Sequence, residues 1–175
     1  MTSALRRGLC VAAASLLAAC ATPRATAPGE LLAGRLAVRI DSTPPRSVSA
    51  SFELSGTPRQ GELVLSGPLG TTAAQARWAP GEASLVSGGQ RNEYPDLESL
   101  AVDALGERIP IAALFDWLRG RAWPGAASQP RSDGEAGFEQ LGWQISLTRW
   151  QEGWVEARRQ AAPVVTVRAK LDSPS

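Results

Sequence analysis

The chain of 175 residues contains no histidine, and its two cysteines, Cys10 and Cys20, both lie near the N-terminus. Without histidine, Ser-His and Cys-His catalysis is excluded, and so are most transition-metal sites. The charges almost cancel, with a formal net charge of +1, and no run of one sign is long enough to form a docking patch. The composition therefore argues against a nucleic-acid partner, and we expect neither a metal nor a cofactor.

A long apolar run is also missing, because the longest candidate, residues 9–17, is too short to span a bilayer as a helix. It follows Arg6 and Arg7 and ends in Leu17-Ala18-Ala19-Cys20, which resembles a bacterial lipoprotein signal. We expect residues 1–19 to be removed and Cys20 to be acylated on its sulfur and its new amino group. The alternative is an ordinary secretory signal with a chance cysteine. With Cys10 removed, the mature chain has no thiol left for a disulfide.

The residues after Cys20 predict the destination of the protein. Lipoproteins kept in the inner membrane typically carry aspartate after the lipidated cysteine, whereas this chain has Ala21. By that resemblance, we expect a lipid-anchored protein of the outer membrane that faces the periplasm. Residues 20–29, with Pro23 and Pro28, suit a flexible tether, and residues 30–175 suit a single domain.

Alternating apolar residues predict a β-rich domain. Leu36, Val38 and Ile40 share one strand face, and Val48, Ala50, Phe52 and Leu54 share another. With further strand patterns up to residue 87, the first half predicts a meander of about five or six antiparallel strands. Strand patterns return at residues 138, 143–147, 154–158 and 164–171, after a loop predicted at residues 121–137.

Two helices are predicted between these groups of strands. Asp96 can cap the first, which Gly106 ends, and Pro110 suits the first turn of the second, which Gly120 ends. About nine or ten strands are too many for an ordinary sandwich of this length. We therefore expect a curved sheet or incomplete barrel, with the helices across its opening.

One turn carries an unusual residue. Between two predicted strands, Gly67-Pro68-Leu69-Gly70 has the chemistry of a tight connection but places a large aliphatic side chain in its middle. Two interpretations are open: Leu69 folds back onto the sheet, or it projects and touches a membrane or lipid.

Several segments together resemble the LolB family of outer-membrane lipoproteins. They are Gly34-Arg35-Leu36-Ala37-Val38-Arg39, Gly67-Pro68-Leu69-Gly70-Thr71-Thr72, Ile109-Pro110, Ala113-Leu114-Phe115-Asp116-Trp117-Leu118-Arg119-Gly120 and Gly142-Trp143. Their order and approximate spacing match over nearly the whole mature chain, and the lipoprotein signal agrees with them.

The resemblance implies an unclosed antiparallel β-barrel with a helical lid over a hydrophobic cavity. It also implies a monomeric receptor that accepts the acyl chains of client lipoproteins from the periplasmic carrier LolA and inserts those proteins into the inner leaflet of the outer membrane. No nucleotide would be needed, and the sequence has no glycine-rich phosphate loop followed by Lys and Ser or Thr.

The same resemblance assigns roles to residues. Pro68, Leu69 and Gly70 would form the membrane-insertion loop. Apolar residues facing inward would line the lipid cavity: Leu36, Val38, Phe52, Leu54, Leu63, Leu65, Leu114, Phe115 and Leu118. Alternation alone does not distinguish a cavity from a solid core, so core packing is the other interpretation of each. Trp143 and Trp150 suit packing or rim positions.

Two other functions remain open at this stage. An envelope-assembly lipoprotein could bind a protein partner through the same curved sheet. A hydrolase would have to use the carboxylates of Glu53, Asp96, Asp103 and Asp116, which have no partner at motif spacing. We therefore expect a protein that is not an enzyme.

Overall fold

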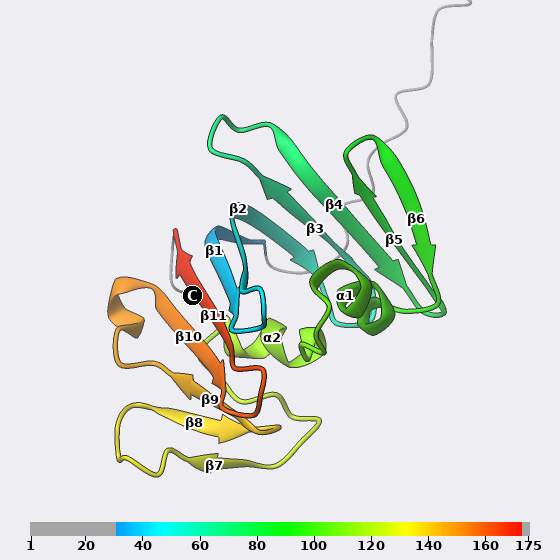
Figure 1. Ribbon diagram of the computed structural model, residues 1–175. Helices are drawn as coiled ribbons and strands as arrows, with labels where there is room; N and C mark the ends of the chain where they lie inside the picture. The colour runs from blue at the N-terminus through cyan, green and yellow to red at the C-terminus, as the bar shows by residue number, and fades with distance from the viewer. Residues whose placement is uncertain (1–30, 173–175) are drawn as a thin grey trace, which may run out of the picture.

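A computed structural model describes residues 31–172, which form one curved antiparallel sheet and two α-helices. The sheet has eleven strands in the order β6-β5-β4-β3-β2-β1-β11-β10-β9-β8-β7, and its first and last strands do not meet. The predicted mainly-β, unclosed barrel is therefore confirmed (Figure 1). The predicted signal peptide, Cys20 and the tether lie outside the described residues.

Strands and helices follow one another along the chain with short connections. The first half contains β1 Leu32–Ile40, β2 Arg46–Gly56, β3 Gly61–Ser66, β4 Thr72–Ala79, β5 Glu82–Ser87 and β6 Gln90–Tyr94. Then come α1 Leu97–Leu105 and α2 Ile111–Trp117. The second half contains β7 Ser128–Pro130, β8 Gly137–Gln140, β9 Trp143–Ser146, a 3₁₀ turn Trp150–Glu152, β10 Trp154–Arg159 and β11 Val165–Leu171.

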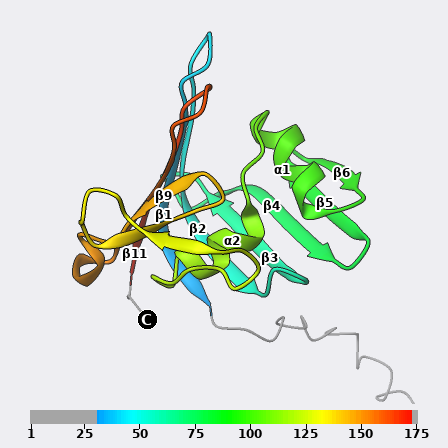
Figure 2. The same cartoon turned by 90° about the horizontal axis from the view of Figure 1, so that it is seen from below.

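Strand β1 joins the two halves of the sheet because it pairs with both β2 and β11. Val38 lies opposite Val48 on one side and opposite Val167 on the other. Every second residue of β11, from Val165 to Leu171, is buried in the core, as the alternation predicts. Val48 lies on the same face of β2 as Phe52 and Leu54, as predicted, but it is 46% exposed. The β1–β2 and β10–β11 hairpins extend well beyond the helices, so the inner face has no cover there (Figure 2).

Helix α1 begins and ends where its caps predict. The Asp96 side chain accepts a hydrogen bond from the Ser99 amide (2.7 Å), and Gly106 takes the left-handed conformation with φ 70°. The helix packs against β5 and β6. The helix therefore lies over the first half of the sheet, near its β6 edge.

Helix α2 lies inside the curve of the sheet and contacts both halves (Figure 2). Phe115 and Leu118 belong to one apolar cluster, with residues from β1 to β5, α1 and β11. Ala113 and Trp117 belong to a second cluster, built mainly from β1, β9, β10 and β11. Phe115 meets Trp78 edge-on at 5.7 Å, and Trp117 meets Trp143 at 5.9 Å between ring centres. The helix therefore fills much of the space that the sheet encloses.

The segment predicted as a loop, residues 121–137, contains the strand β7 at the edge of the sheet and the first residue of β8. Its three residues pair with β8 and are all exposed. Pro130 suits an edge strand because it needs no ladder hydrogen bond on its free side. A three-residue strand has too little alternation to be recognised in the sequence, and this is why the predicted strand number was too low.

Within residues 31–172, neither helix has the length and hydropathy needed to cross a bilayer.

Candidate functional site

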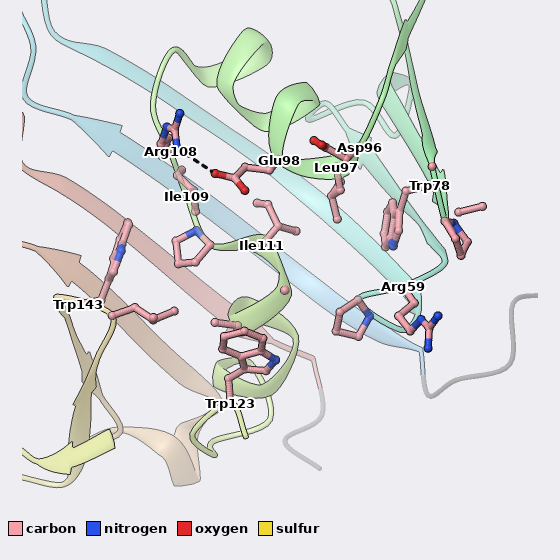
Figure 3. Close-up of a pocket in the computed structure, with 18 of the residues that line it drawn as sticks. Arg59, Trp78, Asp96, Leu97, Glu98, Arg108, Ile109, Ile111, Trp123 and Trp143 are labelled. Atoms are coloured by element: carbon pink, nitrogen blue, oxygen red, sulfur yellow. Dashed lines mark hydrogen bonds and ion pairs between the residues drawn. The ribbon is translucent and has the colours of Figure 1, made fainter. Parts of the chain in front are cut away.

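An apolar groove of about 720 Å³ opens beside the beginning of α2. Trp78 and the turns after β2 and β4 form one side, and Trp123, Leu141 and Trp143 form the other. Leu97 of α1 also lines it, and residues 109–113 run along its length. Figure 3 shows Trp123 and Trp143 on the side opposite Trp78 and Arg59, with Ile111 between them. Such an apolar hollow suits a hydrocarbon ligand.

Charged residues of both signs line the groove, and two of them form an ion pair with each other. Glu98 and Arg108 approach to 3.5 Å across the mouth, and both side chains are largely exposed (Figure 3). An ion pair of this kind contributes little to stability in water. The pair therefore balances one positive and one negative charge at the groove, while its walls stay largely apolar.

Arg159 at the end of β10 fixes the link between the two helices. Its Nη2 donates to Glu107 Oε2 (2.8 Å) and to the Pro163 carbonyl (3.1 Å), and its Nη1 donates to the Arg108 carbonyl (3.3 Å). The guanidinium also lies over the Trp143 ring, 5.8 Å from its centre. The ion pair between Arg159 and Glu107 is partly buried. Together with the bond to the Arg108 carbonyl, it holds the link that leads into α2 against the second half of the sheet.

The residues predicted to line a lipid cavity are found in the two apolar clusters and not along the groove. Five are buried: Val38, Phe52, Leu54, Phe115 and Leu118. Four are half-buried against the clusters: Leu36, Leu63, Leu65 and Leu114. Six of them lie on strands, and the other three lie on α2 or at its end. Their role as a cavity lining stays a prediction.

Sequence reasoning missed several residues that do line the groove. Ile109 precedes the second helix, and Trp123 and Leu141 lie in connections between elements. Ile111, the first residue of α2, lines the groove as well. A tryptophan within the Pro- and Gly-rich segment 121–137 is the signal that could have identified Trp123, because surface loops seldom carry large aromatic residues.

The Leu69 turn projects its side chain into solvent. The Gly70 amide donates to the Gly67 carbonyl (2.9 Å) and the Gly67 amide donates to the Thr71 carbonyl (2.9 Å), while Gly70 has φ 74°. These backbone bonds define a tight turn whose shape does not depend on the Leu69 side chain. Leu69 is 92% exposed, so it does not fold back onto the sheet, and Pro68 and Gly70 are exposed beside it. A role in membrane insertion stays a prediction.

Leu141 at the rim has a backbone conformation that leucine rarely adopts. It forms the β8–β9 turn with Gly142, and the two residues have φ 54° and 75°. Such a turn favours Asn-Gly, and a left-handed residue with a Cβ costs about 1–2 kcal/mol. Leu141 is nevertheless 48% exposed and lines the groove. The strained backbone therefore holds a large apolar side chain at the rim of the groove.

We therefore expect Leu141→Asn to raise the free energy of unfolding by about 1 kcal/mol, because asparagine tolerates this conformation better than leucine. Urea denaturation of the soluble domain measures the change. Leu141→Ala is the control, since it removes the same side chain but keeps the unfavourable backbone, and it should give no gain. Equal stability of Leu141→Asn and Leu141→Ala would contradict the strain argument.

Asp96, at the groove entrance, makes the stability of α1 depend on pH. Its hydrogen bond from the Ser99 amide lowers the pKa of Asp96 below the ordinary value of 3.8. A lowered pKa means that the folded state favours the carboxylate. The stabilisation is therefore complete above the unfolded pKa and is lost as the pH falls through the folded pKa.

We expect the melting temperature of the wild-type chain to fall relative to that of Asp96→Asn below about pH 4, because asparagine caps a helix without titrating. Thermal melts followed by circular dichroism from about pH 6 to about pH 3 test this. Parallel melting curves for the two proteins over that range would show that the cap does not titrate.

The carboxylates considered for a hydrolase serve other contacts. Asp96 caps α1, Asp103 accepts a hydrogen bond from the Tyr94 hydroxyl (2.6 Å), and Asp116 pairs with Arg121 Nε (2.6 Å). Glu53 is exposed on β2. Within residues 31–172, the apolar groove beside α2 is therefore the candidate binding site.

An open antiparallel sheet wrapped around one helix, with an apolar groove and a leucine exposed on a tight turn, defines a half-barrel protein with an apolar surface groove. Comparison with known proteins gives the family. The model of the family described as "Outer membrane lipoprotein LolB" matches residues 31–170. The chain belongs to this LolB family, which confirms the predicted resemblance.

Individual relatives agree with this assignment. A protein of Chromobacterium violaceum named outer-membrane lipoprotein LolB is 32% identical over 155 residues, which cover 83% of each chain. A protein of the same name from Bordetella petrii is 35% identical over 160 residues, or 85% of this chain and 78% of its own. A third, from Cupriavidus metallidurans, is 32% identical over 94% of this chain and 85% of its own length.

Proposed function

We propose that this protein is the receptor that accepts lipoproteins from the periplasmic carrier LolA and inserts them into the inner leaflet of the outer membrane. As a member of the LolB family, it is a lipid-anchored lipoprotein of that membrane. The observation that carries the proposal is the apolar groove beside α2, which is open to solvent and can take an acyl chain. Leu69, exposed on its turn, supplies an apolar contact for the membrane.

The energetics of acyl chains explain why such a groove is needed. Each methylene exposed to water costs about 0.8 kcal/mol, so a lipoprotein cannot cross the periplasm with its chains free. A groove that offers apolar walls removes this cost during transfer. Transfer then needs only a difference in affinity between carrier, receptor and membrane, and no nucleotide.

The position of α2 suggests the order in which surfaces are used. The groove along the beginning of this helix is accessible in the conformation described, whereas the predicted cavity residues lie on the strands behind α2 or on the helix itself and are packed in the two clusters. We infer that an acyl chain first enters the groove. The strand residues behind α2, such as Phe52 and Leu54, would contact the chain only if the helix moved outward.

Transfer from a loaded carrier tests the proposal. Soluble chain comprising residues 21–175 would be mixed with a LolA–lipoprotein complex, and the cargo followed by affinity capture with and without liposomes. We expect the cargo to move to the soluble chain and then, when liposomes are present, to the membrane. If the cargo stays on LolA, the receptor function is wrong, and binding of a protein partner through the sheet becomes the alternative.

A further inference from the structure

Trp123 forms one side of the groove although it belongs to a connection that has little regular structure. Its side chain faces the beginning of α2 and lies on the same side as Trp143 (Figure 3). It is half-buried and packs against the apolar cluster of the second half of the sheet. An aromatic side chain here can limit the width of the groove only if its backbone is held in place.

Gln140 holds that backbone through a complete set of hydrogen bonds. Its Oε1 accepts from the Trp123 amide (2.9 Å) and from Trp117 Nε1 (2.8 Å). Its Nε2 donates to the carbonyls of Trp123 and Ala126, each at 2.7 Å. A side-chain amide has two donor hydrogens and an oxygen that accepts two bonds, so every one of its hydrogen-bonding positions is used. Gln140 is 2% exposed, and this set of bonds allows only one orientation of its amide.

The bonds of Gln140 connect three elements. Gln140 ends β8, Trp117 ends α2, and Trp123 lies in the connection that follows α2. The amide thus ties the tryptophan loop both to the sheet and to the helix that runs beside the groove. A buried network in which every group is satisfied gives a unique local arrangement.

Gly125 shows that the indole of Trp123 has a defined place as well. A Cβ added at Gly125 would overlap with the six-membered ring of Trp123. The indole therefore folds back over the glycine, and any larger residue there must displace it. Gly125 is exposed, and its φ lies outside the left-handed region, so alanine brings no backbone strain at this position.

We propose that Trp123 determines which acyl groups the groove accepts, and that Gln140 is the positioning residue that holds Trp123 in place. This inference rests on the proposed function, because the ligands are the acyl chains of lipoproteins. With its indole fixed, the groove has a set width and fits the chains closely. When the indole is removed or displaced, the groove is wider. A ligand with two acyl chains then loses contacts with the walls, whereas a ligand with three chains gains room for the third.

Binding of two synthetic lipopeptides tests the specificity. They share one peptide and carry either two or three acyl chains, and their Kd values are measured with soluble chain by fluorescence anisotropy. Relative to wild type, we expect Trp123→Ala to shift the ratio of the two Kd values by about tenfold in favour of the triacylated peptide, as is usual when the volume of an apolar pocket changes. Gly125→Ala and Gln140→Met should shift the ratio in the same direction.

Controls separate positioning from stability. Gln140→Met keeps the length of the side chain but removes its hydrogen bonds, and it will also destabilise the fold. Val155→Ala shortens a buried residue in the same apolar cluster without touching the tryptophan loop. It should lower stability while leaving the ratio of Kd values unchanged. An equal shift in Val155→Ala, or an unchanged ratio in Trp123→Ala or Gly125→Ala, would overturn the inference.

A spectroscopic measurement tests the positioning without any cargo. 5-Fluorotryptophan labels the six tryptophans of the chain, and Trp123→Phe identifies the ¹⁹F signal of Trp123 by its loss. We expect that signal to move towards the position of solvent-exposed indole in Gln140→Met and Gly125→Ala but not in Val155→Ala. An unmoved signal would overturn the role of Gln140. If wild type binds neither lipopeptide, the proposed function fails together with the specificity, while the fluorine spectrum still decides the positioning.

Discussion

Leu69→Glu should take cargo from LolA as well as wild type does but deliver about tenfold less of it to liposomes. Burying a leucine side chain contributes about 1.5–3 kcal/mol, and about 1.4 kcal/mol corresponds to a factor of ten. A carboxylate at the same place must instead be moved into an apolar environment, which is unfavourable. The measurement is the transfer assay, scored separately for uptake without liposomes and for delivery with them.

The structure explains why uptake should be spared. Leu69 is 92% exposed and does not line the groove. Backbone bonds between Gly67, Gly70 and Thr71 hold the turn, so the substitution leaves its shape intact. Thr72→Glu is the matched control, since it adds the same charge at an exposed position nearby, at the start of β4.

The role of Leu69 at the membrane requires that Leu69→Glu lose delivery while keeping uptake. Normal delivery by Leu69→Glu would show that the turn does not act at the membrane. Equal defects in Leu69→Glu and Thr72→Glu would mean that negative charge in this region, and not loss of the leucine, is responsible. Recovery of delivery in Leu69→Met would support the need for an apolar side chain at the tip.

Local sequence patterns predicted the elements of this fold well. The alternation of β11, the Asp96 cap and the Gly106 end of α1 all appear where the sequence placed them. Each of these depends on interactions within a few residues or on one face of a strand. For the same reason, the exposure of Leu69 could be foreseen as one of two interpretations of its turn.

The groove could not be predicted in the same way, because it depends on contacts between distant segments. Alternation showed that Phe52 and Leu54 face inward, but not that α2 fills the space in front of them. Trp123 owes its position to Gln140, which lies 17 residues further along the chain. Nothing in the local pattern around either residue indicates their pairing.

Ala112→Trp should block uptake of cargo by filling the groove from within. Ala112 is the second residue of α2, is half-buried and lines the groove, and it belongs to neither apolar cluster. A tryptophan side chain at this position would take the space that an acyl chain needs, and forcing both into the groove costs about 1–3 kcal/mol. We therefore expect cargo to bind about ten- to a hundredfold more weakly, since each 1.4 kcal/mol is a factor of ten. Uptake from LolA without liposomes measures this directly.

Two substitutions keep this result interpretable. Ala112→Ser alters the same position without filling space, and it should take up cargo normally. Ala104→Trp adds the same indole on the exposed side of α1, away from the groove, and should also be normal. If Ala112→Trp takes up cargo at the wild-type level, the groove is not where acyl chains bind. In that case α2 must move outward to admit them, and the predicted cavity residues on the strands behind it and on the helix itself become the binding surface.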